Sequence, residues 1–319
     1  MDFCSPSIKL KNKKYCYNKP SLIVIINSWN ALNNNNKIDF NNTDTTAILM
    51  KKLNIKFQQL LHKKVDTYWA WIDIIKLQAT KQSNYKIIDN LKKIENMTLR
   101  PSQPTDWVKN PQEWLSNFDI QKVINQYQEI SALKYKFLGV FSIDFGLKNK
   151  SDNKTCLFSK HCNINIASIL ASKKVSYIGF ITNLSRSSEP GTHWTSSFFV
   201  LDPSLPSYGG YYYDSTARKI PQDLQPVFID IKSQAEKLFL KKPFPVYVNN
   251  NRHQHGNNAC GLFSIAFQVR WVLLLKNNKK TIISDVINHP SFTDTKMDVL
   301  RLKYFRPNIL SIKKIKESI

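Results

Sequence analysis

The 319-residue sequence has little glycine, half as many acidic as basic residues and no long hydrophobic run. No apolar stretch approaches the roughly 20 residues that a membrane-spanning helix needs. The N-terminus lacks the basic region and apolar stretch of a signal peptide. The five cysteines are odd in number and scattered, which argues against a disulfide framework. We therefore expect a soluble protein of a reducing compartment, without a membrane span.

The charge balance is strongly basic. Lysine and arginine outnumber acidic residues by 46 to 23, which gives a formal net charge of +23. Such an excess favours non-specific contact with nucleic acid, because each neutralised phosphate releases counterions. The lysines are spread along the chain, however, and no aromatic-interleaved or Gly-Arg tract accompanies them. Solvated lysines and an AT-rich genome explain the excess equally well, so both interpretations stay open.

The first hundred residues have the apolar spacing of helices, at Ser21 to Leu32, Thr45 to Leu61 and Val65 to Leu77. The absence of glycine before Gly139 suits a helical region. Two helices joined by an asparagine-rich loop also resemble a small SAP-like nucleic-acid module, although an arm that packs on the rest of the protein explains them better.

Three prolines then punctuate a connector: Pro101, Pro104 and Pro111. We place a boundary here and predict a helical N-terminal arm domain over residues 1–105 and a second domain over residues 106–319.

The second domain differs from the first in residue composition. Segments rich in Val, Ile, Phe and Tyr predict strands, and longer segments predict helices. The predicted strands are 175–183, 194–202, 208–214 and 245–249; the predicted helices are 222–240 and a buried one over 260–275. Clustered strands with surrounding helices predict an α+β fold.

Cys260 stands where a polar loop meets this buried helix. A helix N-terminus carries partial positive charge and free backbone N–H groups, which stabilise a thiolate. The same groups can donate to an oxyanion that forms beside the sulfur. A cysteine in this position is more often a core residue, so a catalytic interpretation depends on its partners.

A nucleophilic thiol needs a base and a group that orients the base. His193 begins one predicted strand and Asp214 ends the next, so pairing of the two strands as a hairpin brings them side by side. Asp202 is the rival orienting group, but it ends the strand that His193 begins and is too distant at about 3.3 Å per residue. Gln254, six residues before Cys260, is a neutral donor that could reach the same oxyanion.

The order His, Asp and Gln-x5-Cys-Gly resembles the Ulp1/adenain-type cysteine proteases. The likeness is strongest to the viral branch found in large DNA viruses, of which the African swine fever virus polyprotein protease is typical. The matching pieces are Gly191-Thr192-His193-Trp194, Tyr213-Asp214-Ser215, Asn251 to Gln254, Ala259-Cys260-Gly261 and a Trp-Leu motif at Trp114-Leu115. Together they cover roughly residues 110–305.

The resemblance implies a papain-type catalytic domain with a helical N-terminal extension. It assigns Cys260 as nucleophile, His193 as general base, Asp214 as orienting group and Gln254 as oxyanion donor. It also implies that Trp114 and Trp194 flank a narrow tunnel for Gly-Gly, because two indole walls exclude larger side chains.

The function implied is cleavage of viral structural polyproteins after Gly-Gly during virion maturation, in the virion and the infected-cell cytoplasm, with no metal or organic cofactor. One alternative is removal of a ubiquitin-like modifier from its conjugates. Another is a basic nucleic-acid-binding or structural virion protein on an inactive protease scaffold.

The remaining candidates are weaker. Three potential zinc ligands lie close together in sequence, one fewer than a structural site needs, so ordinary thiols are the preferred interpretation of the cysteines: Cys156, His161 and Cys162, with Cys4 and Cys16 far away. His253 and His255 are expected to pack the loop around Gln254, and Trp69 and Trp71 to serve the helical core.

Overall fold

The computed structural model describes residues 3–10, 13–61, 67–149, 151–152, 154–171 and 174–311. The chain divides into two compact units, Met1–Pro111 with Leu302–Ile319, and Gln112–Arg301. The predicted boundary after residue 105 lies six residues before the first of these divisions. Residues 302–311 belong with the helical unit and not with the second unit, a long-range arrangement without a local sequence pattern.

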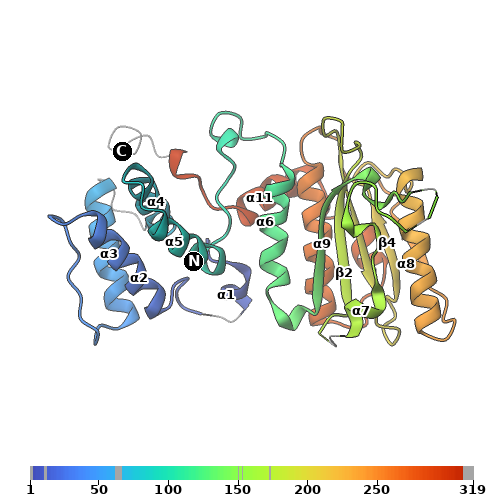
Figure 1. The fold of residues 1–319 in the computed structure, drawn as a ribbon, viewed down its shortest axis with the longest axis horizontal. Coiled ribbons are helices and arrows are strands. Elements are labelled where there is room, and N and C mark those ends of the chain that lie inside the picture. The colour runs from blue at the N-terminus through green and yellow to red at the C-terminus, as the bar shows by residue number, and fades with distance from the viewer. Residues whose placement is uncertain are drawn as a thin grey trace. The chain divides into compact units, whose positions relative to one another are not determined.

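The first unit is helical. It contains α1 (Pro6–Leu10), α2 (Lys19–Leu32), α3 (Thr46–Leu61), α4 (Trp71–Lys81) and α5 (Tyr85–Thr98) (Figure 1). The predicted helices at 21–32 and 45–61 are confirmed as α2 and α3. The third predicted helix begins later than expected, at Trp71, and its first two residues, 65 and 66, lie outside the described residues.

Aromatic side chains fill the core of this helical unit. Trp71 is fully buried, and its ring stacks on those of Tyr17 and Phe57. Trp69 is partly buried against the same core and contacts Phe3 edge-on. Both tryptophans therefore pack in the helical core, as the sequence predicted.

Arg306 anchors the C-terminal segment in the first unit. Its guanidinium is buried and pairs with the carboxylates of Asp73 and Glu95. It also donates to the carbonyl oxygens of Trp69 and Arg100. A buried charge is tolerated only when it is paired and hydrogen-bonded, so these contacts fix where the segment lies.

The second unit contains a five-stranded mixed sheet in the order β1-β2-β3-β4-β5. The β1–β2 and β4–β5 pairs are parallel and the two central pairs antiparallel. Its elements are α6 (Asn117–Gln128), β1 (Tyr135–Ser142), α7 (Ile166–Ala171), β2 (Tyr177–Asn183), β3 (Trp194–Val200), β4 (Gly209–Tyr213), α8 (Gln225–Leu238), β5 (Val246–Val248), α9 (Cys260–Asn277), α10 (Ser284–Ile287) and most of α11 (Asp294–Tyr304), whose last three residues fall in the first unit.

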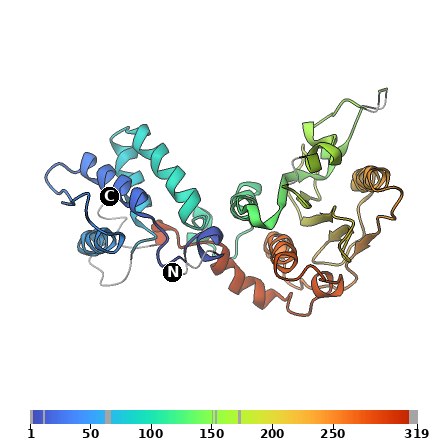
Figure 2. The same ribbon diagram turned by 90° about the horizontal axis from the view of Figure 1, so that it is seen from below.

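Helices cover both faces of this sheet, with α9 on one side and α8 on the other (Figures 1 and 2). Every residue of β2 and β3 is buried, as expected for strands covered on both faces. Along β3 the side chains alternate: Phe198 stacks on Trp271 of α9, and Phe199 packs on Phe228 of α8. The sheet thus holds α9, and Cys260 at its start, in a fixed place.

The predicted strands and helices of this unit are all present, and the α+β class is confirmed. The sequence prediction missed β1, in which Gly139 has φ +143° and interrupts the register with β2. It also missed α6, although Ser116 and Asp119 form a capping box at its start.

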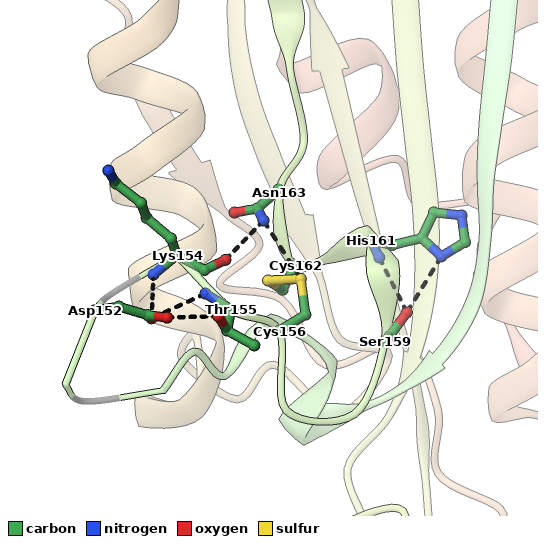
Figure 3. Close-up of a disulfide and its surroundings, with 8 residues drawn as sticks. All are labelled: Asp152, Lys154, Thr155, Cys156, Ser159, His161, Cys162 and Asn163. Carbon is green, nitrogen blue, oxygen red and sulfur yellow. Dashed lines mark hydrogen bonds between the residues drawn. A yellow bond between two sulfur atoms is a disulfide. The ribbon is translucent and has the colours of Figure 1, made fainter.

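The expectation that the cysteines are unpaired thiols is wrong for four of the five. Cys4 is bonded to Cys16 and Cys156 to Cys162. Pairing depends on how the chain folds back on itself, which spacing alone does not reveal. The second disulfide closes a short loop next to His161, whose ring nitrogen is hydrogen-bonded to Ser159 (Figure 3). These two cysteines are therefore not zinc ligands.

Candidate active site

Cys260 is the first residue of α9, an 18-residue helix. All five cysteines lie in the described ranges, and Cys260 alone has a free thiol. The first backbone N–H groups of a helix have no partner within the helix. Cys260 is therefore a buried residue at the positive end of the helix dipole, where backbone N–H groups have no partner within the helix.

The hairpin of β3 and β4 brings His193 and Asp214 together, as the sequence predicted. The strands pair antiparallel, with His193 immediately before β3 and Asp214 immediately after β4. The distance between His193 Nε2 and Asp214 Oδ1 is 2.8 Å. Asp202, the rejected rival, lies in the turn after β3, where it accepts hydrogen bonds from Ser204.

The electrostatics of this pair favour a charged imidazole. Burial would lower the pKa of His193, but hydrogen bonding and charge interactions with Asp214 and Cys260 outweigh it and raise the pKa to about 9. Burial would raise the pKa of Asp214, yet His193 and Thr216 together lower it. With Nε2 bound to the carboxylate, the other ring nitrogen is left for the thiol.

Backbone and side-chain contacts fix the position of Asp214. The amide and hydroxyl of Thr216 both donate to Asp214 Oδ1 at 2.7 Å. Asn249 accepts from the Asp214 backbone N–H at 2.9 Å and donates to its carbonyl oxygen at 2.7 Å. The other carboxylate oxygen, Oδ2, is buried and has no hydrogen-bond partner.

Gln254 is buried in the loop between β5 and α9. Its Nε2 donates to the carbonyl oxygen of Gly256 at 2.8 Å, and its Oε1 accepts from Ser215 Oγ at 2.6 Å. A carboxamide nitrogen has two hydrogens, so one N–H of Gln254 remains for another acceptor.

The two tryptophans differ in exposure. Trp194 is 8% exposed, and its indole N–H donates to the carbonyl oxygen of Leu115 at 3.0 Å. A Cβ on Gly261 would lie 3.2 Å from Leu115 Cβ and 3.3 Å from Trp194 Cδ1. Trp114 is 41% exposed. The Trp114-Leu115 segment and Trp194 therefore both lie at the start of α9, beside Cys260.

Of the two histidines that flank Gln254, His253 has the expected packing role, whereas His255 is exposed. His253 is buried, stacks on Tyr213 and shares a hydrogen bond between its Nδ1 and the tyrosine hydroxyl. The backbone N–H of His255 donates to Asp294. In the described ranges, no group of three or more His, Cys, Asp or Glu side chains is arranged to hold a metal ion. Every helix in those ranges is too short or too polar to cross a membrane.

Four residues that contact this site were not identified from the sequence as members of it: Ser215, Thr216, Asn249 and Asp294. Thr216 could have been found, because a Thr two residues after an Asp commonly donates to it in a turn. The other three act across 35 or more residues, where sequence carries no local pattern.

No protein-family model matches the chain. The protein R355 of Acanthamoeba polyphaga mimivirus, named as a candidate thiol protease, is 24% identical over 281 residues, covering 85% of this chain and 84% of R355. Two crystal structures of the African swine fever virus pS273R protease align with TM-scores of 0.59 and 0.53 at 15% and 16% identity. Each covers 96% of both chains.

The chain therefore has the fold of the pS273R protease, and the α+β class expected from the sequence is confirmed. With the mimivirus relative, these similarities support a cysteine protease of the viral type, as the sequence resemblance predicted.

Proposed function

We propose that this chain is a cysteine endopeptidase that cleaves viral structural polyproteins after Gly-Gly, with Cys260 as nucleophile, His193 as base, Asp214 as orienting group and Gln254 as oxyanion donor. One observation carries the proposal: the single free thiol among the described residues begins a helix and interacts with a histidine that is held by a buried carboxylate.

The chemistry follows from this arrangement. A protonated His193 beside Cys260 favours the thiolate, the reactive form of cysteine. The sulfur attacks the scissile carbonyl carbon, and the oxyanion formed is met by the Cys260 backbone N–H and the remaining N–H of Gln254. His193 then gives its proton to the leaving amine, which leaves an acyl-enzyme. Water, deprotonated by His193, hydrolyses the thioester and restores the thiol.

The surroundings of Cys260 support specificity for glycine. Leu115 and Trp194 both lie close to Gly261, the residue after the nucleophile, so the Trp114-Leu115 segment and Trp194 border the site. In the proposed complex, the substrate backbone passes beside the indole rings of Trp114 and Trp194 to reach the nucleophile. Glycine offers no side chain to clash with these rings.

The substrate class rests on the resemblance to viral polyprotein proteases and on the full-length match to the pS273R protease. On the same grounds we propose a role in virion maturation, in the virion and the infected-cell cytoplasm. Removal of a ubiquitin-like modifier is the second candidate, since such a modifier ending in Gly-Gly presents the same two residues to the site.

The test is cleavage of quenched peptides with the sequence Gly-Gly-X, compared with Ala-Gly-X and Gly-Ala-X, by the wild type and Cys260→Ala. We expect turnover only with Gly-Gly-X and none with Cys260→Ala. Full-length conjugates of ubiquitin-like modifiers assayed in parallel separate the two candidates, because a deconjugase would prefer them to short peptides.

A contrary result is equally clear. No turnover of peptide or conjugate, together with Cys260 labelling by iodoacetamide that is unchanged in His193→Ala, would show that the pair is inactive. Steeply salt-dependent DNA binding in the same protein would then favour the basic structural protein on an inactive scaffold.

A further inference from the structure

The carboxamide of Gln254 is held at both of its ends, and this fixes where its remaining N–H points. The atom that faces the Gly256 carbonyl oxygen must be Nε2, because a carbonyl can only accept a hydrogen bond. Oε1 therefore faces Ser215, whose hydroxyl acts as the donor. The donor and acceptor roles of these two partners therefore determine which end of the Gln254 carboxamide is oxygen and which is nitrogen.

Ser215 holds Gln254 through two different groups. Its hydroxyl donates to Oε1 at 2.6 Å, and its carbonyl oxygen accepts from the backbone N–H groups of His253 and Gln254, both at 2.9 Å. Ser215 directly follows Asp214, so the orienting carboxylate and the clamp on Gln254 come from adjacent residues at the end of β4. Donation to Oε1 also polarises the amide and strengthens Nε2–H as a donor.

Asp294 holds the other end. Its Oδ2 accepts from the backbone N–H groups of His255 and Gly256, at 2.8 and 3.1 Å. Gly256 is the residue whose carbonyl oxygen binds Gln254 Nε2. Asp294 is the first residue of α11, so a helix start that is distant in sequence fixes the loop immediately before the nucleophile.

We infer that Ser215 and Asp294 are positioning residues that hold Gln254 with one N–H directed at the oxyanion of the proposed reaction. Neither touches the reacting atoms. Ser215 fixes the plane of the Gln254 carboxamide. Asp294 fixes the position of the loop whose Gly256 carbonyl oxygen accepts a hydrogen bond from Gln254 Nε2. The inference rests on the proposed function.

The decisive experiment is a double-mutant cycle on Gly-Gly-X cleavage. Loss of a complete oxyanion donor lowers kcat by roughly 10²–10³-fold, so we expect Gln254→Ala to fall in that range. Ser215→Ala leaves the donor present but loose, and we expect about a tenfold loss of kcat with KM within about twofold. Because Ser215 acts through Gln254, adding Ser215→Ala to Gln254→Ala should lower kcat no further.

Ser207→Ala is the matched control. Ser207 is as buried as Ser215, but its hydroxyl has no hydrogen-bond partner and it precedes β4 at the opposite end from Asp214. We expect wild-type kcat for this variant. For the other clamp, Asp294→Ala should lower kcat by about tenfold, whereas Asp294→Asn keeps an acceptor oxygen and should recover most of it.

Iodoacetamide labelling of Cys260 distinguishes a positioning role of Ser215 from a general structural role. Alkylation needs the thiolate but no oxyanion donor, so Ser215→Ala and Gln254→Ala should label at the wild-type rate. Additive losses in the double mutant, or slower labelling in Ser215→Ala, would show a general structural role and overturn the inference. A wild type that cleaves nothing overturns the proposed function, and the inference with it.

Discussion

Replacing Asp214 by Asn tests how much of the proposed chemistry depends on the charge of the carboxylate and not on its shape. Asn keeps an oxygen that can accept from His193 Nε2 and from Thr216, so the geometry around Oδ1 is retained. The negative charge is lost. The nitrogen of the new amide would occupy the place of Oδ2, which is buried without a partner.

Two effects follow, and each has a magnitude. The pKa of His193 is raised from its ordinary 6.5 to about 9 against the effect of burial, and Asp214 contributes first among the groups that raise it. That shift corresponds to a free energy of order 3 kcal/mol. Without the charge, burial remains and the pKa should fall by at least about one unit. The unsatisfied amide donors should lower the free energy of unfolding by about 1–3 kcal/mol.

The assay is the pH dependence of kcat/KM for a Gly-Gly-X peptide. The active pair requires protonated His193, which exists below its pKa, so activity of the wild type should fall as pH rises through about 9. In Asp214→Asn this fall in activity at high pH, the alkaline limb of the profile, should move to lower pH. Asp202→Asn, the same change in the turn after β3, should leave the limb in place. An alkaline limb that is identical in all three proteins would refute the assignment of Asp214 as the charge that sustains His193.

Three further predictions concern the rest of the chain. Arg306→Ala removes the positive charge that pairs with the carboxylates of Asp73 and Glu95 in a buried site. We expect the free energy of unfolding, measured in urea, to fall by about 3–5 kcal/mol. A fall below about 1 kcal/mol would show that the ion pairs contribute little to stability. Replacing Cys4 and Cys16 together by Ala should cost about 2–3 kcal/mol, because the disulfide closes a loop of 12-residue separation; equal stability of wild type and variant under oxidising conditions would contradict this. The first unit holds 23 of the 46 basic residues but 9 of the 23 acidic ones, so we expect it to bind DNA at low salt. For each phosphate contacted, the logarithm of the binding constant should fall by about 0.9 for every tenfold increase in salt concentration. Salt-independent binding, measured by fluorescence anisotropy, would exclude a phosphate-contacting surface.

The sequence predicted most of the catalytic unit because its elements have strong local patterns. The strands before and after the turn at 201–208 are dense in aromatic and β-branched residues, and hairpin pairing of adjacent strands placed His193 beside Asp214 without any other information. The start of α9 was visible as a change from polar loop to apolar helix at Cys260.

The features that the sequence did not reveal depend on distant parts of the chain. Arg306 meets Asp73 across 233 residues, and Asp294 meets Gly256 across 38. The disulfides are more local, with paired cysteines 12 and 6 residues apart, but spacing alone does not show that the folded backbone brings them within bonding distance. β1 was missed for a different reason: Gly139 interrupts its alternating pattern at a bulge.

The most direct test of the central claim is intact-protein mass spectrometry after incubation with a short peptide that ends in a Gly-Gly vinyl ester. Such an electrophile captures a thiolate that lies at the end of a glycine-accepting channel. We expect one adduct on Cys260 in the wild type, none in Cys260→Ala, much slower capture in His193→Ala, and no capture of the matching Ala-Ala peptide. Equal capture of the Gly-Gly and Ala-Ala peptides, or no adduct in the wild type, would contradict that claim.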